Sequence, residues 1–589
     1  MMDVLRRMPP AAKGFLNMRT WCTACPSILL LLLMAAPQAQ AASNAITVGE
    51  MEFDPSTVNT IGVSLPILSG DANYNATVLV SYRKAGTSAW KEALPLLRVR
   101  PETLSAEDPS PFVVAEQFAG SIFDLDAGAV YEVKLDVQDP DGGIATRIGT
   151  TTTRSNPGNS PAVPRLVSVS TIAALSTALS SASPGDVITL ANGTYSGSIT
   201  VSRSGTEANP IFIRGESRDG AILNASGAQY GITVTGSNVT VENLTVKSSS
   251  WGIRIGNTSN VVVRGLRVTD VYYGVDARGG VNRNYYICDN LLEGKGAVWP
   301  DVSNRTWDYE GIVVTGTGHV VCHNTLSGFG DSLSLSSNTS IPNRAIDFFG
   351  NDVLWGGDDG VELDFSERNV RAFRNRFNNV SMGISFQPAW GGPVYAFRNI
   401  IYNTANAPYK LNNDPSGFYI LHNTSVRAGW AWAQYSGYAA NFRFHNNVTI
   451  GTQDAVDMST DIMLGQINYN GWSPNGQFRF TTTWNGFSSL QANSPYEHNG
   501  VLLNAPIFEA AVPIPANYTT LMSPLTNVTL HANSNAVDKA LLLPNINDTF
   551  TGRAPDMGAW EIGQAPPVYG VRSSSVSPPT SPANLQVVP

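Results

Sequence analysis

The sequence predicts an all-β protein in which a parallel β-helix follows a small β-sandwich. Short apolar runs recur along the middle of the chain, and five of them contain an asparagine that returns every 24 residues. Apolar and polar residues alternate within each run with the period of two that is typical of strands, and Gly and Asn separate the runs. One such coil cannot bury its apolar face alone, so the pattern predicts stacked coils. The five asparagines are Asn351, Asn375, Asn399, Asn423 and Asn447.

Stacking turns columns of the sequence into columns in space. The asparagines are therefore expected to form an internal ladder in which each amide bonds the turn of the next coil, because a buried amide needs partners. Cys288 and Cys322 precede Asn290 and Asn324 by two residues each, which places the two cysteines side by side on consecutive coils. Either a disulfide or a pair of stacked core thiols fits this placement.

Residues 1–41 have the features of a secretory signal. Basic residues precede an apolar run over 28–36, and the small-residue sequence Ala39-Gln40-Ala41 follows. We therefore expect a secreted protein, extracellular or periplasmic. No other stretch is long and apolar enough to predict a membrane span.

The charge balance of the chain narrows the choice of partners. The chain has 37 basic and 46 acidic residues, and removing the predicted signal lowers the net charge from −9 to −12. This balance disfavours nucleic acid, whose phosphates require a basic surface. An acidic polysaccharide would need a local basic patch or a bridging cation. We expect a polysaccharide substrate and a monomeric protein.

Residues 46–152 contain short alternating strands separated by turn residues, which predicts a β-sandwich. This segment resembles a fibronectin type III module, with Tyr82 near Trp90 and with Tyr131 opening a late strand. The resemblance implies a spacer that positions the next domain, or else a binding module. A polar linker over 153–165 follows.

The predicted β-helix domain spans 166–450. Apolar residues at helical spacing over 170–182 predict a short helix that covers the open end of the first coil. The segments 184–195 and 202–216 resemble the opening turns of right-handed β-helix polysaccharide lyases of the chondroitinase B and alginate lyase family, which implies right-handed coils. Residues 451–565 are expected to form a C-terminal β cap, and 566–589 a disordered Ser/Pro-rich tail.

Each coil has a second strand that turns alternate residues into the core, so the other residues form columns on one outer surface. The inward positions are apolar, whereas polar and charged residues gather at the outward positions. The first column is Arg254, Asp276, Val313, Ser334, Glu362, Ser385 and Lys410, and the second is Gly256, Arg278, Thr315, Ser336, Asp364, Gln387 and Asn412.

Four carboxylates lie within seven residues at Asp358-Asp359-Gly-Val-Glu362-Leu-Asp364, and stacking brings Asp331 of the preceding coil beside them. Like charges this close cannot all remain ionised and unpaired. Oxygen ligands at this density suit Ca²⁺. We predict a Ca²⁺ site formed by Asp331, Asp358, Asp359 and Glu362. The alternative is that the two adjacent aspartates cap a turn while the other acids are solvated on the sheet.

Lys410 follows Glu362 by 48 residues, two repeats, and is therefore expected on the same column about 10 Å away. A lysine near a bound cation shifts toward its neutral form, as a general base requires. The pair fits β-elimination, in which the cation draws charge from a uronate carboxylate and the base removes the neighbouring proton. An ordinary solvated lysine is the alternative. The catalytic candidates are Lys410, Glu362, Asp364 and Arg278.

These residues resemble the pectate lyase family that uses an Asp-Asp-Gly-x-Asp calcium motif and a lysine base further along the β-helix. Asp358, Asp359 and Glu362 match the three motif acids, with Glu replacing the third Asp, and Lys410 stands where the base would be. In the chondroitinase B type, Glu362-x-Asp364 resembles the paired calcium acids, but Asn369 stands where that family's lysine base would fall.

The sequence thus predicts a secreted enzyme that degrades polysaccharides, with a Ca²⁺-dependent lyase acting on a uronate-containing glycan as the first interpretation. A glycoside hydrolase on the same fold would instead use two of Asp331, Asp359, Glu362 and Asp364 as its catalytic pair. A non-catalytic glycan-binding or surface β-helix is the third interpretation, because solenoids host unrelated functions.

Overall fold

The computed structural model describes residues 44–100, 103–104, 112–297, 299–302, 309–336, 342–434, 437–458 and 460–572. The predicted secretory signal and residues 573–589 of the predicted tail lie outside these ranges. No helix in the described ranges is long and apolar enough to cross a membrane.

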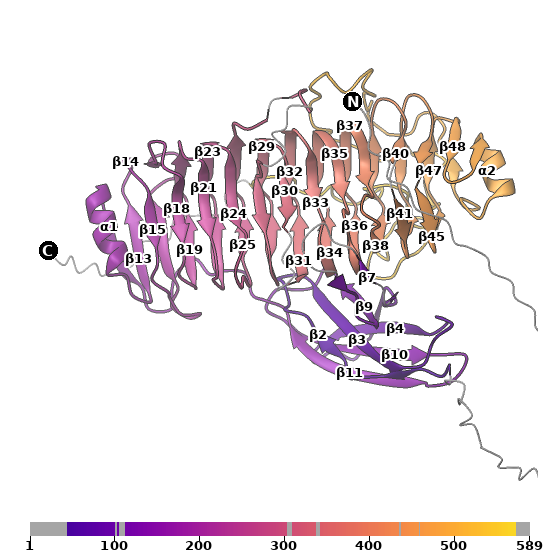
Figure 1. Cartoon of the computed structure of the whole chain (residues 1–589), viewed down its shortest axis with the longest axis horizontal. Coiled ribbons are helices and arrows are strands. Elements are labelled where there is room, and N and C mark those ends of the chain that lie inside the picture. Colours follow the sequence, from indigo (N-terminus) through magenta and orange to yellow (C-terminus); the bar gives the residue numbers. More distant parts are fainter. Residues whose placement is uncertain are drawn as a thin grey trace, which may run out of the picture. The chain divides into compact units, whose positions relative to one another are not determined.

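The N-terminal part of the described chain is a β-sandwich of antiparallel strands, as the alternation of its sequence predicts (Figure 1). One sheet has the order β1-β3-β9-β6 with β2 beside β3, the other has the order β11-β10-β4-β5, and β7 pairs with β8. Val133 and Leu135 of β10 face the core between the sheets together with Val78 and Val80 of β4. The strands are β1 (Thr47–Val48), β2 (Glu52–Phe53), β3 (Ile61–Ser69), β4 (Thr77–Lys84), β5 (Lys91–Ala93), β6 (Leu97–Val99), β7 (Thr103–Leu104), β8 (Phe112–Val113), β9 (Gln117–Ile122), β10 (Val130–Gln138) and β11 (Ala145–Thr152).

The remainder is a parallel β-helix, which confirms the predicted fold class. Among the described residues, one of its sheets has 15 strands and another has 20. The 15-stranded sheet consists of β12 (Arg165–Val169), β13 (Asp186–Leu190), β16 (Ile211–Gly215), β19 (Val239–Glu242), β22 (Val261–Arg264), β25 (Tyr286–Cys288), β28 (Val320–Cys322), β31 (Asn343–Phe349), β34 (Ser366–Phe373), β36 (Trp390–Phe397), β38 (Ser416–Leu421), β41 (Tyr438–Ala440), β42 (Arg443–His445), β45 (Asp461–Met463) and β46 (Gln466–Asn468).

The 20-stranded sheet carries the outward columns that the sequence predicts. Its strands are β14 (Gly193–Ser196), β15 (Ile199–Val201), β17 (Ala221–Asn224), β18 (Tyr230–Val234), β20 (Thr245–Lys247), β21 (Trp251–Ile255), β23 (Arg267–Val271), β24 (Tyr273–Ala277), β26 (Leu291–Gly294), β27 (Ile312–Val314), β29 (Thr325–Phe329), β30 (Leu333–Leu335), β32 (Asp352–Gly356), β33 (Asp359–Glu362), β35 (Arg376–Ser385), β37 (Ile400–Lys410), β39 (Thr424–Val426), β43 (Val448–Ile450), β47 (Gly471–Ser473) and β50 (Val501–Leu502). A further sheet consists of β40 (Trp432–Gln434), β44 (Val456–Met458), β48 (Gln477–Arg479) and β49 (Thr483–Asn485).

Both ends of the coil stack are covered by short helices. Helix α1 (Ile172–Ser180) begins after Thr171, whose side chain accepts a hydrogen bond from the backbone N–H of Ala174 as an N-cap does. Its Leu175 and Leu179 join the core cluster of the coils. At the other end, Phe487 and Leu490 of α2 (Phe487–Asn493) join the same cluster.

The predicted asparagine ladder is present, and it is longer than predicted. Each Oδ1 accepts hydrogen bonds from both the backbone N–H and the Nδ2 of the asparagine one coil earlier, at 2.9–3.1 Å. The ladder starts at Asn290, continues past Asn447 to Asn470, and ends on the buried carboxylate of Glu497. Parallel pairing thus continues beyond residue 450, through β47 to β50.

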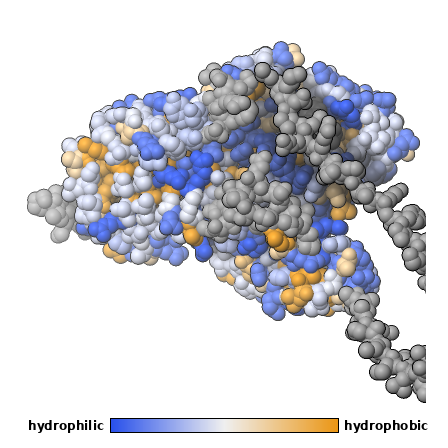
Figure 2. All heavy atoms as spheres, viewed as in Figure 1, coloured by the Kyte–Doolittle hydropathy of each residue, from blue (hydrophilic) through white to orange (hydrophobic). Residues whose placement is uncertain are grey.

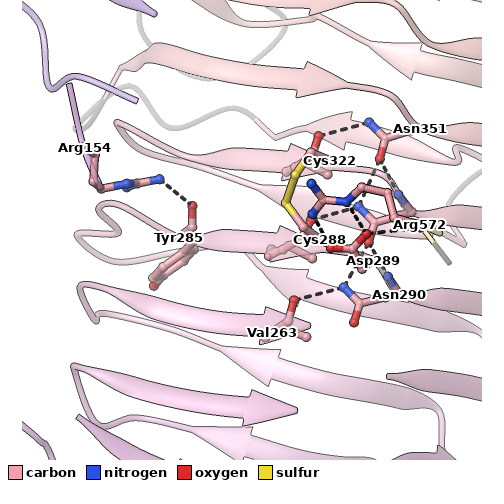
Figure 3. Close-up of a disulfide and its surroundings, with 12 residues drawn as sticks. Arg154, Val263, Tyr285, Cys288, Asp289, Asn290, Cys322, Asn351 and Arg572 are labelled. Carbon is pink, nitrogen blue, oxygen red and sulfur yellow. Dashed lines mark hydrogen bonds and ion pairs between the residues drawn. A yellow bond between two sulfur atoms is a disulfide. The ribbon is translucent and has the colours of Figure 1, made fainter. Parts of the chain in front are cut away.

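Cys288 and Cys322 form a disulfide between neighbouring strands of the 15-stranded sheet, with their Cα atoms 4.5 Å apart (Figure 3). Of the two arrangements that the sequence left open, the structure therefore has the disulfide. Arg572 pairs with Asp289 beside it, so the last described residues lie against the middle coils (Figure 3).

The chain after β50 packs along the side of the coils. Met557, Ala559 and Trp560 contribute to an apolar cluster with Ile400 and Val448 of the 20-stranded sheet. The Ala554–Glu561 string, which the sequence suggests as part of a C-terminal cap, thus covers a flank, and α2 covers the end.

The sandwich contacts the 15-stranded sheet through buried polar groups. Asp347 of β31 accepts hydrogen bonds from the hydroxyls of Thr57 and Thr60, at 2.5 and 2.9 Å, and pairs with Arg371 of β34 at 2.7 Å. Asp347 and Arg371 are fully buried. A buried charge of this kind requires its partners, so the contact specifies how the sandwich docks.

Candidate active site

The predicted outward column of the 20-stranded sheet is confirmed by the strand register. Arg254 pairs with Asp276, Asp276 with Val313, and Val313 with Ser334. Further along, Leu333 pairs with Val361, Glu362 pairs with Ser385, and Ser385 pairs with Lys410. Glu362 and Lys410 therefore lie on one column two coils apart. Figure 2 shows hydrophilic residues gathered over the middle of the β-helix.

Three acids of the predicted metal site converge. Asp331 precedes β30, Asp359 begins β33 and Glu362 ends it, and one carboxylate oxygen from each lies within 4.8 Å of the other two. The backbone fixes this arrangement, since the N–H of Asp359 donates to Oδ1 of Asp331 at 3.0 Å and the N–H of Ser332 donates to the carbonyl of Asp359 at 2.9 Å.

Two further acids flank the three. Asp358 is not one of the converging acids, and its role as a metal ligand stays a prediction. Asp364 is buried and accepts hydrogen bonds from the hydroxyl of Ser385 at 2.7 Å and from the N–H of Gln387 at 2.6 Å. Asp364 therefore fixes the position of Ser385, which lies between Glu362 and Lys410 on the column.

Lys410 reaches back over Ser385 to the acids. Its Nζ lies 2.8 Å from Oδ2 of Asp359, and the side chains of the two residues are 11% and 0% exposed. Burial alone would lower the pKa of Lys410, but the carboxylates of Asp359, Asp364 and Glu362 outweigh this and raise the pKa above its ordinary value. With the site as it stands, Lys410 is an ammonium ion.

The acids repel one another. Burial, followed by the charges of neighbouring carboxylates, raises the pKa of Asp358 to about 7 and the pKa values of Asp331 and Glu362 well above their ordinary range. Burial also raises the pKa of Asp364 to about 7, against the opposing effect of Lys410. One ammonium group does not neutralise this cluster of carboxylates.

The residues present fit a hard divalent cation. Oδ1 of Asp359 is buried and makes no hydrogen bond within the described part of the chain, although its partner oxygen is paired with Lys410. A buried carboxylate oxygen left in this way is an available ligand. Carboxylate oxygens from Asp331, Asp359 and Glu362 are ligands of the kind that Ca²⁺ takes. A bound Ca²⁺ would also relieve the repulsion among these carboxylates.

Arg278 lies at a distance from the acids. It follows β24, three strands before β33 in the sheet, which is about 14 Å at the usual strand spacing. It pairs with Asp276 at 3.0 Å and with Glu310 at 3.0 Å, while Arg254 pairs with Asp276 from the preceding coil. Its catalytic role stays a prediction, and the structure does not bring it together with Lys410.

Asn369 lies in the 15-stranded sheet and faces the sandwich. Its Nδ2 donates to Asp54 at 2.7 Å and its Oδ1 accepts from the hydroxyl of Ser121 at 2.9 Å. The position that would hold the base in the chondroitinase B type therefore belongs to the docking contact.

Ser385 is the residue of this site that sequence reasoning did not single out. It is fully buried between Glu362 and Lys410 on the column and donates to Asp364. Its place in the outward column was the available signal, but a serine there is indistinguishable from other small polar residues of a sheet surface.

The fold and the site define a parallel β-helix protein with an acidic centre on one outer sheet. No family model matches this sequence, and no curated protein is similar enough to count as a relative. Among solved structures, the chain is similar to the pectate lyase Pel9A, with a TM-score of 0.39 and 17% identity over 68% of this chain and 96% of that one. It is also similar to a family 28 exopolygalacturonase of Yersinia enterocolitica, with a TM-score of 0.37 and 10% identity over 72% and 99%. A third is an alginate lyase from Paenibacillus sp. str. FPU-7, with a TM-score of 0.26 and 19% identity over 51% and 98%. The β-helix assignment stands on the strand pairing of this chain.

Proposed function

We propose that this protein acts outside the cytoplasm as a Ca²⁺-dependent polysaccharide lyase that cleaves a uronate-containing glycan by β-elimination. The observation that carries the proposal is the convergence of Asp331, Asp359 and Glu362 with the amine of Lys410 beside them. Elimination beside a carboxylate needs a cation that binds the carboxylate and a base that takes the proton. The acids would hold the cation, and Lys410 would be the base.

Asp331, Asp359 and Glu362 would hold the cation, and Asp358 would complete or adjust the site from the adjoining turn. A bound Ca²⁺ would draw charge from the carboxylate of the uronate and so acidify the proton on the neighbouring carbon. The negative charge of these carboxylates raises the pKa of Lys410. A cation bound to them would offset that charge and so lower the pKa of Lys410.

Lys410 in its neutral form would then take the acidified proton. The electron pair of that C–H bond forms the new carbon–carbon double bond, the glycosidic C–O bond breaks, and the leaving oxygen takes a proton from solvent. Asp364 would position Ser385 and so the surface between the acids and the base. Because Arg278 lies about 14 Å along the sheet from the acids at the usual strand spacing, we assign it to binding the glycan rather than to the proton transfer.

A panel of uronate-containing glycans tests this proposal through the absorbance of the unsaturated product. We expect at least one glycan to give this absorbance with Ca²⁺ and to lose it in the presence of a chelator. If products form without a conjugated double bond, or if the absorbance is indifferent to the chelator, the proposal is overturned.

A glycoside hydrolase is the second candidate, and the raised pKa of Asp364, about 7, favours it. A carboxyl group with this pKa remains partly protonated near neutral pH and can act as a general acid, with Glu362 or Asp359 as the second carboxylate. New reducing ends without absorbance of a double bond would identify this activity.

A further inference from the structure

We propose that a hollow one coil beyond Lys410 is a sugar subsite that takes an uncharged pyranose residue of the same glycan chain. This inference rests on the proposed function, because it assumes that a glycan lies along the column that contains Glu362 and Lys410. It adds that the substrate has a neutral sugar next to the uronate.

The hollow continues the column of the active site. Trp432 of β40 donates from Nε1 to the carbonyl of Tyr409 at 3.2 Å, and the N–H of Leu411 donates to Oε1 of Gln434 at 3.0 Å. These bonds place Ala433 beside Lys410, and Ala433 pairs with Asp457 of the following coil. Ala433 follows Lys410 on this column, and its small side chain leaves the surface hollowed beside the long lysine.

The hollow has a volume of about 480 Å³, within the range of small-molecule sites. Its lining combines one indole, four amides, one methionine and small residues, with one charged residue among the described residues that line it. The lining residues used below are Asn406, Asn412, Arg427, Trp430, Gln434 and Gln453.

The charge of Arg427 serves the protein rather than a ligand. Its guanidinium donates to three backbone carbonyls, those of Trp430 at 2.7 Å, Ala405 at 3.0 Å and Thr404 at 3.3 Å. Arg427 is also 7% exposed. Three of the five N–H groups of this guanidinium are thus bonded to the backbone, whereas a carboxylate at the acidic centre would meet the proposed cation.

The remaining polar groups suit hydroxyls. Nδ2 of Asn412 donates to Gln387 at 3.0 Å and Nε2 of Gln434 donates to Oδ1 of Asn412 at 2.7 Å, so the floor is an ordered row of amides. Asn406 and Gln453 are exposed at its rim. Amides both donate and accept, as sugar hydroxyls do.

Trp430 supplies an apolar wall beside these amides. It is half-buried and is held at its carbonyl by Arg427. An indole presents a flat apolar face on which the C–H side of a pyranose ring can pack, while the amides meet its hydroxyls. Each coil advances about 4.8 Å, close to the length of one sugar residue in an extended chain, so neighbouring sugars would meet neighbouring coils.

Titration calorimetry on the whole protein tests the subsite without any need for catalysis. The probes are neutral tetrasaccharides of glucose, mannose, galactose and xylose, and tetrasaccharides of galacturonate, mannuronate and guluronate, each with Ca²⁺ and with a chelator. The variants are Trp430→Ala, which removes the wall, and Ala433→Leu, which fills the hollow. Trp90→Ala, on the half-buried tryptophan of the sandwich, is the matched control.

We expect at least one neutral tetrasaccharide to bind the wild-type protein with and without the chelator. Trp430→Ala and Ala433→Leu should each weaken this binding about tenfold or more, and Trp90→Ala should leave it unchanged. If the two variants lose binding of the neutral tetrasaccharide in a protein that eliminates no uronate glycan, that outcome would support the subsite and overturn the proposed lyase activity. Elimination of a glycan in which uronate alternates with a neutral sugar, with equal kcat/KM in the wild type and both variants, would keep the lyase and overturn the subsite. Absence of neutral binding, or equal loss in Trp90→Ala, would also overturn it.

Discussion

The ammonium of Lys410 lies 2.8 Å from the carboxylate of Asp359, although the two residues are 51 positions apart in the sequence. Asp359 begins β33 and Lys410 ends β37, and β35 lies between the two strands. The contact therefore spans two coils, and it exists because strand register holds Glu362, Ser385 and Lys410 on one line.

Replacement of Lys410 tests its proposed role as the base. Lys410→Ala should lower turnover of an active uronate glycan by about 10²–10⁴-fold, the usual contribution of a general base. Lys410→Arg should be nearly as inactive, because a guanidinium keeps the positive charge beside Asp359 but does not deprotonate in this pH range. The rate of increase in absorbance of the unsaturated product measures both. A fully active Lys410→Ala protein would refute the role of Lys410.

Calcium should raise the thermal stability of the protein, because a ligand that binds the folded state stabilises it by mass action. The gain is about 2.7 kcal/mol at a Ca²⁺ concentration 100 times the Kd. Glu362→Gln should remove most of this gain, and without Ca²⁺ the variant should be no less stable than the wild type, because one repelling carboxylate is gone. Asp461→Asn, at an exposed acid far along the chain, is the control. Thermal unfolding with and without a chelator makes the comparison, and equal Ca²⁺ responses in the wild type and Glu362→Gln would rule out this site.

Sequence periodicity predicted what stacking dictates. The interval of 24 residues gave the ladder from Asn351 to Asn447, and the outward column from Arg254 to Lys410 followed from strand alternation. The ladder and the column both repeat once per coil, so a correct alignment of one coil with the next places every residue of each. The ladder beyond Asn447 escaped prediction because the interval changes to 23 residues at Asn470 and a glutamate then takes the place of asparagine.

Side-chain direction in turns and docking between distant segments were not predictable. Asp358 precedes β33 and Asp359 is the first residue of that strand, and Asp359 is one of the three converging acids whereas Asp358 is not. Nothing periodic distinguishes the two in the sequence. Asn369 contacts Asp54 across 315 positions, a pairing that depends on how the sandwich docks on the sheet. Such contacts carry no local signal.

Removal of Asp347 should show that the sandwich is an integral part of the fold. Asp347→Ala would leave the fully buried guanidinium of Arg371 without its carboxylate, which typically costs about 3–5 kcal/mol. Asp126→Ala, which removes an exposed ion pair with Lys84, should change the stability little, because solvent screens that pair. Thermal unfolding of both variants compares them. If the sandwich acts only as a spacer, the two variants should both lose little stability.

The asparagine ladder should be costly to interrupt. Asn399→Ala removes the acceptor of two groups of Asn375, its backbone N–H and its Nδ2, and the donor to Ala372 and Asn423. Because these groups are buried, we expect a loss of roughly 2–6 kcal/mol. Asn533→Ala, at an exposed asparagine, should change stability by about 0.5 kcal/mol or less. Urea unfolding of the two variants tests this, and an equally small loss in both would mean that the ladder does not stabilise the coils.

Glu497 closes the ladder with a group that titrates. It is fully buried and accepts hydrogen bonds from Asn470 and from Nε1 of Trp472. Burial raises the pKa of Glu497 from 4.5 to about 7, against the opposing effect of these hydrogen bonds.

The end of the ladder should therefore weaken as pH rises. The folded protein binds the proton of Glu497 more tightly than the unfolded chain, so its stabilising contribution is complete below pH 4.5 and is lost between pH 4.5 and about 7. The shift corresponds to about 3 kcal/mol. Other buried acids act in the same direction, so Glu497→Gln isolates the effect, because Gln keeps one acceptor and does not titrate. Urea unfolding at pH 4.5 and 7.5 should show the free-energy difference between wild type and variant falling by about this amount. A difference that is the same at both pH values would mean that Glu497 is ionised in the folded protein.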